Sequence, residues 1–91
     1  MQTLSTIEIL EQLKETVGNG SDASRWLGRA YLSWYRGGSH LIALNGFESL
    51  DSRNRNLFAQ MLTLRKRPQW DDQSLYELEQ ELIQMMDARS Y

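Results

Sequence analysis

The sequence has no cysteine, one histidine and one proline among its 91 residues. Without cysteine the chain can form neither a disulfide nor a thiolate zinc site, and it has no cysteine nucleophile. One histidine leaves too few ligands for a typical zinc or transition-metal site, so we expect no metal and no other cofactor. Secreted domains of this size usually carry disulfides. We therefore expect a cytoplasmic protein, in keeping with a bacterial or viral source.

Long apolar runs are also missing. The longest is Leu41-Ile42-Ala43-Leu44, far short of the roughly 20 residues that a membrane-spanning helix needs. The N-terminal residues are polar and acidic, unlike the basic and then apolar layout of a signal peptide. With 41% hydrophobic and 24% charged residues, the composition is typical of one soluble globular domain without membrane association.

Apolar side chains recur at helical spacing in four segments of the chain. In the first segment they share one broad face: Ile7, Ile9, Leu10, Leu13 and Val17. We predict helices over residues 6–17, 23–36, 52–66 and 72–87. Ser5 and Glu8 fit a capping box at the first start, Ser21 or Asp22 fits the second, Asp51 or Ser52 the third, and Asp71 the fourth. Four helices with short connections predict an all-α fold, a compact bundle that forms a single domain over residues 1–91.

Gly46 and Gly28 lie where the helical pattern alone does not explain a glycine. Residues 39–50 favour a short extra helix that Ser39 caps and Asn45-Gly46 closes, although Asn-Gly is also the strongest short hairpin pattern. Gly28 lies inside the second predicted helix, where glycine costs about 1 kcal/mol relative to alanine. A close approach by another helix would explain it.

From about residue 27 onward, the order of features resembles a small uncharacterised bacterial family of all-helical domains. The shared features are Trp34-Tyr35-Arg36-Gly37-Gly38, a leucine-bearing segment at 41–44, a helix that carries Phe58, and a Pro-aromatic break at 68–70 before a last acidic helix. The similarity covers about two thirds of the chain. It implies a helical fold and no known activity.

The sequence contains no catalytic constellation, so we expect a protein that is not an enzyme. His40 follows Ser39 directly, but neighbours in sequence rarely face each other as a nucleophile and its base must. Glu77, Glu79 and Glu81 are two residues apart, a spacing that scatters them around a helix instead of gathering them on a metal ion.

Two charged residues fall among apolar positions, Arg65 in the third predicted helix and Glu79 in the fourth. A buried charge is costly unless it is paired. Either each side chain reaches the edge of the core, or the two pair with each other.

The charges are unevenly distributed, with net −3 over residues 1–22, +6 over 23–67 and −5 over 68–91. Arg25, Arg29 and Arg36 fall on one face of the second predicted helix, opposite its apolar arc. Arg53 and Arg55 could extend this basic face. Tyr35 lies off the main apolar arc beside the arginines, as interface anchors often do. These six residues are the predicted partner-binding surface.

The leading hypothesis is a small helical protein that binds another protein, or a second copy of itself, through this surface. An accessory or inhibitor protein of a mobile element would fit the size. The alternative is a nucleic-acid-binding regulator that uses the basic face of helices two and three. The acidic ends and the absence of helix-turn-helix spacing disfavour that alternative. A third possibility is that the arginines are merely solvated. No small-molecule substrate is indicated.

Overall fold

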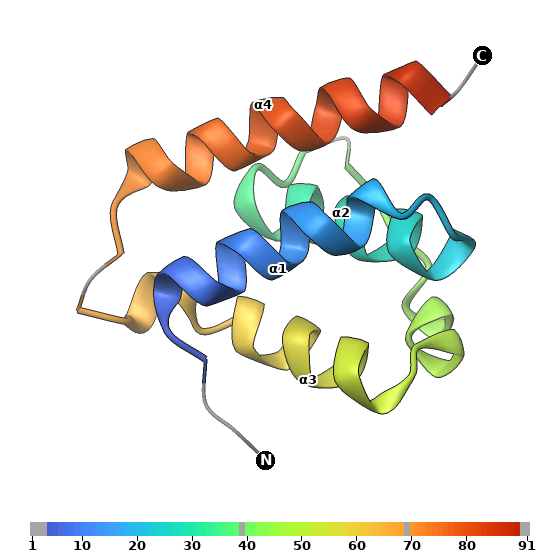
Figure 1. Ribbon diagram of the computed structural model, residues 1–91, viewed down its shortest axis with the longest axis horizontal. Coiled ribbons are helices and arrows are strands. Elements are labelled where there is room, and N and C mark those ends of the chain that lie inside the picture. The colour runs from blue at the N-terminus through green and yellow to red at the C-terminus, as the bar shows by residue number, and fades with distance from the viewer. Residues whose placement is uncertain (1–3, 39, 69, 90–91) are drawn as a thin grey trace.

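Every regular element that the structure describes is helical. The computed structural model describes residues 4–38, 40–68 and 70–89, and those parts contain no strand. The elements are α1 (Thr6–Gly18), α2 (Asp22–Tyr35), the 3-10 helix η1 (Leu44–Ser49), α3 (Ser52–Met61), the 3-10 helix η2 (Leu64–Lys66) and α4 (Asp72–Arg89). The predicted all-α bundle of four helices, with an extra turn between the second and third, is confirmed (Figure 1).

The α-helices begin where their capping residues predict. Ser5 and Glu8 form the full capping box, because the Ser5 hydroxyl accepts the Glu8 N–H and the Glu8 carboxylate accepts the Ser5 N–H. These bonds lower the pKa of Glu8 below its ordinary value. Ser21, Asp51 and Asp71 each accept the backbone N–H of the residue three positions later. Local side-chain bonds to free backbone groups therefore fix all four starts.

Helix α3 ends at Met61, earlier than the predicted end near residue 66. In a continuing α-helix the carbonyl oxygen of Gln60 would accept the N–H of Leu64. It accepts instead the Thr63 N–H at 3.0 Å and the Thr63 hydroxyl at 2.7 Å. Threonine thus competes with the helical hydrogen bond and tightens the chain into η2, which still buries Leu64 completely.

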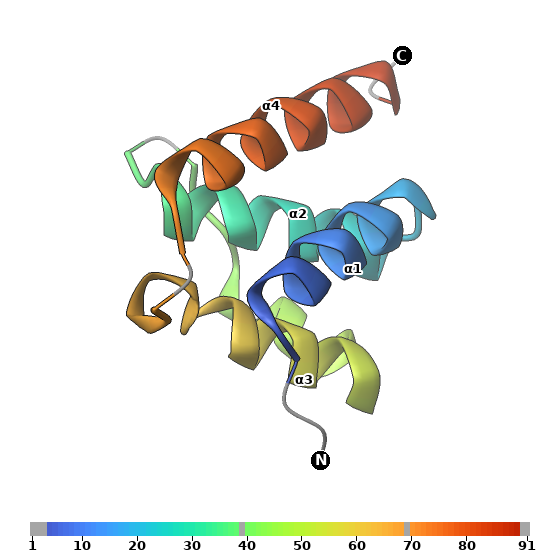
Figure 2. The same cartoon turned by 60° about the vertical axis from the view of Figure 1, so that its left-hand side comes forward.

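Helix α2 is the central element. It packs against α1, α3, α4 and η1, and Figure 2 shows it between α4 and α3. Side chains from all four α-helices, together with Leu4 before α1 and Leu64 of η2, form one core: Leu4, Ile9, Leu13, Val17, Leu27, Ala30, Tyr31, Leu32, Leu57, Met61, Leu64, Leu75, Leu78 and Leu82. Burying each aliphatic side chain contributes about 1.5–3 kcal/mol, so this core is the main source of stability.

Tyr31 is the largest fully buried side chain. Its hydroxyl donates a 2.7 Å hydrogen bond to the backbone oxygen of Leu75 in α4. Burial raises the pKa of Tyr31 above its ordinary value, so the phenol keeps its proton. The bond joins the centre of α2 to the first turns of α4.

The segment between α2 and α3 differs from its prediction. The described part of this segment forms neither a helix before Asn45 nor a hairpin, because residues 40–43 are not helical and η1 begins at Leu44. The predicted cap, Ser39, lies outside the described residues. Trp26 explains this path, since its indole N–H donates to the Ala43 oxygen at 2.7 Å and its ring lies directly against Gly46. A Cβ on Gly46 would lie well inside 3.0 Å of the indole. The glycine therefore serves a close approach and not a hairpin turn.

Gly28 has a similar role inside α2. A Cβ there would meet Met86 Sδ of α4 at 3.1 Å and both methyl groups of Val17 in α1 at 3.3 Å. The predicted close approach is confirmed. Among the described residues, no helix is both long enough and apolar enough to cross a membrane.

Candidate functional site

Arg25 and Arg29 lie one turn apart on the face of α2 that points away from the core, and both are exposed. We call these two residues the α2 arginine pair. Within the described parts of the chain neither forms an ion pair. Like charges four residues apart on a helix repel each other by about 0.2–0.5 kcal/mol. The two arginines therefore repel each other slightly, and an anionic group bound between them would reduce this repulsion.

Arg36, which was predicted to share this face, forms an ion pair with a carboxylate of the same chain. Its Nε and Nη2 atoms donate to the two oxygens of Glu79 at 2.7 and 2.6 Å, in a bidentate pair between α2 and α4. The Glu79 side chain is 3% exposed, whereas that of Arg36 is 53% exposed. The Arg36 hydrogen bonds hold the pKa of Glu79 below its ordinary value. The Arg36 guanidinium thus neutralises a buried acid of the same chain. It is therefore less able than Arg25 or Arg29 to bind a carboxylate of a partner.

Tyr35 is also engaged within the chain. Its hydroxyl donates to Asp72 Oδ1 at 2.9 Å, at the start of α4. Its ring stacks on Tyr31, with centroids 5.9 Å apart and an angle of 14° between the planes. Burial and then the Asp72 hydrogen bond raise the pKa of Tyr35. This half-buried tyrosine fixes α2 to α4 and is a less accessible anchor than its position in the sequence predicts.

Arg65 does not pair with Glu79, which is the alternative that the sequence left open. It donates instead to the backbone oxygens of Trp34 and Tyr35 at 3.4 and 2.9 Å, at the C-terminal end of α2. Its guanidinium lies 4.7 Å from the Trp34 ring centroid. A cation at this end of a helix satisfies free carbonyls and complements the helix dipole. Arg65 thus stabilises the C-terminal end of α2, and Glu79 pairs with Arg36 instead.

Arg53 and Arg55 do not form one extended surface. Side chains two residues apart lie about 160° from each other around a helix. Arg55 turns toward η1, where it donates to the Glu48 oxygen at 3.0 Å and lies over the Phe47 ring. Arg53 is exposed and lies on the same side of α3 as Gln60, which contacts Leu4 before α1. The six predicted residues are therefore divided among separate places, and only Arg25 and Arg29 form an adjacent free pair.

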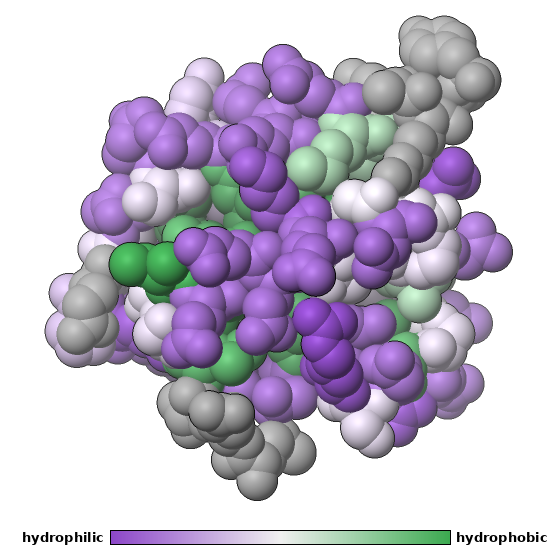
Figure 3. All heavy atoms as spheres, in the orientation of Figure 1, coloured by the Kyte–Doolittle hydropathy of each residue, from purple (hydrophilic) through white to green (hydrophobic). Residues whose placement is uncertain are grey.

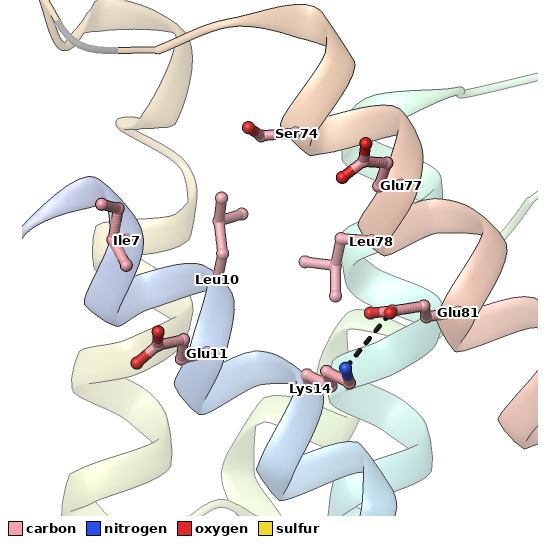
Figure 4. Close-up of a pocket in the computed structure, with 8 residues that line it drawn as sticks. All are labelled: Ile7, Leu10, Glu11, Lys14, Ser74, Glu77, Leu78 and Glu81. Atoms are coloured by element: carbon pink, nitrogen blue, oxygen red, sulfur yellow. Dashed lines mark hydrogen bonds and ion pairs between the residues drawn. The ribbon is translucent and has the colours of Figure 1, made fainter.

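A second feature was not predicted. A groove with a volume of about 250 Å³ lies between α1 and α4, and its lining residues are Ile7, Leu10, Glu11, Lys14, Ser74, Glu77, Leu78 and Glu81. We call it the α1–α4 groove. Leu10 and Leu78 point toward each other across it, and the Lys14–Glu81 ion pair of 3.1 Å bridges one end (Figure 4). In Figure 3 apolar atoms lie in a hollow between these helices, with hydrophilic side chains around them.

The position of Ile7 explains why the sequence did not predict the groove. The sequence predicts Ile7 on the apolar face of the first helix, but it is 68% exposed. It lies about 120° from Leu13 and about 80° from Val17 around the helix axis, at the edge of the apolar arc. That edge position, together with acids one turn apart in the fourth helix, is the pattern that could have indicated a groove.

A catalytic or metal-binding site requires several reactive or ligating side chains close to one another. In the part of the chain that the structure describes, no group of three or more His, Cys, Asp or Glu side chains is placed to hold a metal ion. His40 is half-buried, and its backbone N–H donates to the Gly37 oxygen. Glu79, a buried acid of α4, faces Arg36.

Comparisons with protein-family models, with curated proteins and with solved structures give no match for this chain.

Proposed function

We propose that this chain is a small, non-enzymatic interaction protein that binds an acidic surface of another protein through the α2 arginine pair. The observation that carries the proposal is the position of Arg25 and Arg29, which are exposed, adjacent and without an ion-pair partner among the described residues. Guanidinium groups bind carboxylates in a bidentate geometry. A pair of carboxylates on a partner would relieve the repulsion between the arginines and gain those bonds.

The rigidity of α2 supports this proposal. The helix is packed on three other α-helices, and the buried Tyr31 and the Arg36–Glu79 pair hold it to α4. Arginines on a fixed backbone lose less entropy on binding than arginines on a loop. The pair is therefore presented as a preorganised contact.

Nucleic-acid binding is the second candidate, and the same two arginines favour it. Tight binding to nucleic acid usually neutralises several phosphates, on the order of 6–10 in well-studied cases. Glu79 neutralises Arg36, and Asp22 precedes the pair by one turn. Two free guanidinium groups beside an acid fit a carboxylate pair better than a run of phosphates.

The test compares two double charge reversals that change the net charge equally. Arg25→Glu with Arg29→Glu removes the pair, and Arg53→Glu with Lys66→Glu is the matched control on exposed cations elsewhere. Each variant and the unchanged chain are used as bait in native extract, and captured proteins are quantified by mass spectrometry. We expect a protein that the unchanged chain and the control capture and that the pair variant loses.

Equal recovery of every protein by all three baits would contradict the proposal. Nucleic-acid binding is tested separately, by fluorescence polarisation with mixed-sequence DNA and RNA from low to physiological salt. Binding that falls steeply with salt and disappears in the pair variant would replace the protein partner with the second candidate.

A further inference from the structure

The α1–α4 groove has an apolar floor that water reaches. Leu78 is almost fully buried at its base, Leu10 is half-buried, and Ile7 at its edge is 68% exposed. Its volume of about 250 Å³ is below the roughly 300–1,000 Å³ of small-molecule sites. A cavity of this size, open along two helices, suits one or two aliphatic side chains of a docking segment better than a whole cofactor.

The rim of the groove is acidic. The lining residues include three acids, Glu11, Glu77 and Glu81, and one cation, Lys14, which pairs with Glu81. Two carboxylates, those of Glu11 and Glu77, therefore lack a cationic partner in the described chain, although Glu77 accepts a hydrogen bond from Gln73 at 3.1 Å. An occupant that covers the floor must also neutralise this charge. Lysine or arginine beside an aliphatic side chain meets both requirements.

The spacing of the rim favours a helical occupant. Glu77 and Glu81 are four residues apart in α4, which is about 6 Å along a helix axis, and because Glu81 pairs with Lys14, Glu77 is the carboxylate of this row without a cationic partner in the described chain. A helix laid between α1 and α4 would present aliphatic and basic side chains at the same interval of one turn. This is the geometry of an amphipathic helix in an apolar groove.

We propose that the α1–α4 groove is a second interface, which binds a cationic amphipathic helix of a partner protein. The occupant inserts an aliphatic side chain over Leu10 and Leu78 and places lysine or arginine against Glu77 and Glu11. This site lies on α1 and α4 and does not depend on the α2 arginine pair. With both surfaces in use, the chain would bridge an acidic partner and a basic one.

The probe is a synthetic 14-residue peptide with leucine along one helical face and lysine on both sides of it. Its counterpart carries glutamate in place of every lysine. Binding is followed by NMR titration of the isotope-labelled full chain, which also locates the affected residues. We expect the lysine peptide to shift resonances of α1 and α4 around Ile7, Leu10 and Leu78, and the glutamate peptide to shift none.

Two matched pairs of variants separate the groove from general attraction. Glu77→Lys should weaken binding about fivefold, whereas Glu48→Lys, on exposed η1 with the same change in net charge, should change it less than about twofold. Ile7→Ala should weaken binding by a similar factor, because it removes apolar contact area. Leu41→Ala, which truncates a side chain that is 83% exposed elsewhere, should leave binding unchanged.

Several results would overturn the inference: no binding, equal effects of Glu77→Lys and Glu48→Lys, or shifts confined to α2 and α3. The chain has its own basic surface, so sedimentation equilibrium of the protein without peptide is part of the test. A dimer that Ile7→Ala and Glu77→Lys both dissociate would assign the groove to a second copy instead. Retention of peptide binding by Arg25→Glu with Arg29→Glu would show that the two surfaces are independent.

Discussion

Replacing Gly46 with alanine tests why the segment before α3 takes its path. A Cβ at this position would lie well inside 3.0 Å of Trp26 Cδ1 and Nε1. The indole cannot shift freely, because its N–H donates to the Ala43 oxygen at 2.7 Å and its ring contacts Phe58 at a centroid distance of 5.2 Å. Either η1 or the indole must move: moving η1 disturbs its contact with α2 through Phe47, and moving the indole disturbs the contact with Phe58 that joins α2 to α3.

The expected loss of stability combines three terms. Overpacking costs about 1–3 kcal/mol, and loss of the indole hydrogen bond costs about 0.5–1.5 kcal/mol. The lower entropy of the unfolded chain with alanine returns about 0.4–1 kcal/mol. The net expectation is a destabilisation of about 2 kcal/mol. For a chain of this length, with a total stability of roughly 5–10 kcal/mol, this is a large fraction.

The measurement is urea unfolding, followed by far-ultraviolet circular dichroism and by tryptophan fluorescence. With a slope of about 1–2 kcal/mol per molar urea, Gly46→Ala should lower the midpoint by about 1–2 M. Gly18→Ala is the matched control, because nothing lies within 4 Å of the Cβ that it adds at the end of α1. The control should be neutral or more stable by up to about 1 kcal/mol. Equal midpoints for the two variants would refute the role of the Trp26 contact.

Two further predictions concern the Arg36–Glu79 pair. Arg36→Ala leaves a buried carboxylate without its cation and should lower the thermal midpoint of unfolding by several degrees. Glu79→Leu should lower it less, because the arginine that remains can be hydrated by water. Additive effects of the two changes in the double variant would contradict direct coupling. Because the folded-state pKa of Glu79 is below its ordinary value of 4.5, its ionised form stabilises the fold above that pH, and this contribution is lost as the pH falls through the lowered pKa. Thermal unfolding from pH 7 to pH 3 should therefore show the original chain losing more stability on acidification than Glu79→Leu, and parallel curves would argue against the lowered pKa.

The helices themselves could be predicted because their determinants are local. The Ser5–Glu8 box and the caps at Asp51 and Asp71 act over three residues, and the apolar period of the core acts over one or two turns. The exposure of Arg25 and Arg29 follows from the same period. No knowledge of the rest of the chain is needed for these features.

Two other local patterns gave wrong predictions, one because a distant contact decided its outcome and the other because two local hydrogen bonds compete for the same oxygen. Asn45-Gly46 is a hairpin pattern in isolation, yet Gly46 is needed where Trp26 approaches from α2. The end of α3 depended on which donor the Gln60 oxygen accepts, and it accepts both the N–H and the hydroxyl of Thr63. A pattern that permits several conformations is resolved by packing.

The surfaces were decided almost entirely by tertiary structure. Glu79 could be identified as a buried acid from its place in the apolar arc, but its partner is 43 positions away and only the packing of α2 on α4 selects it. The α1–α4 groove joins two helices at opposite ends of the sequence. The sequence by itself determined the helices and the outward arginines, because hydrogen bonds and periodicity act between near neighbours. Which charges stay free and where a hollow remains depend on how those helices pack, because that is a property of distances between residues far apart in the chain.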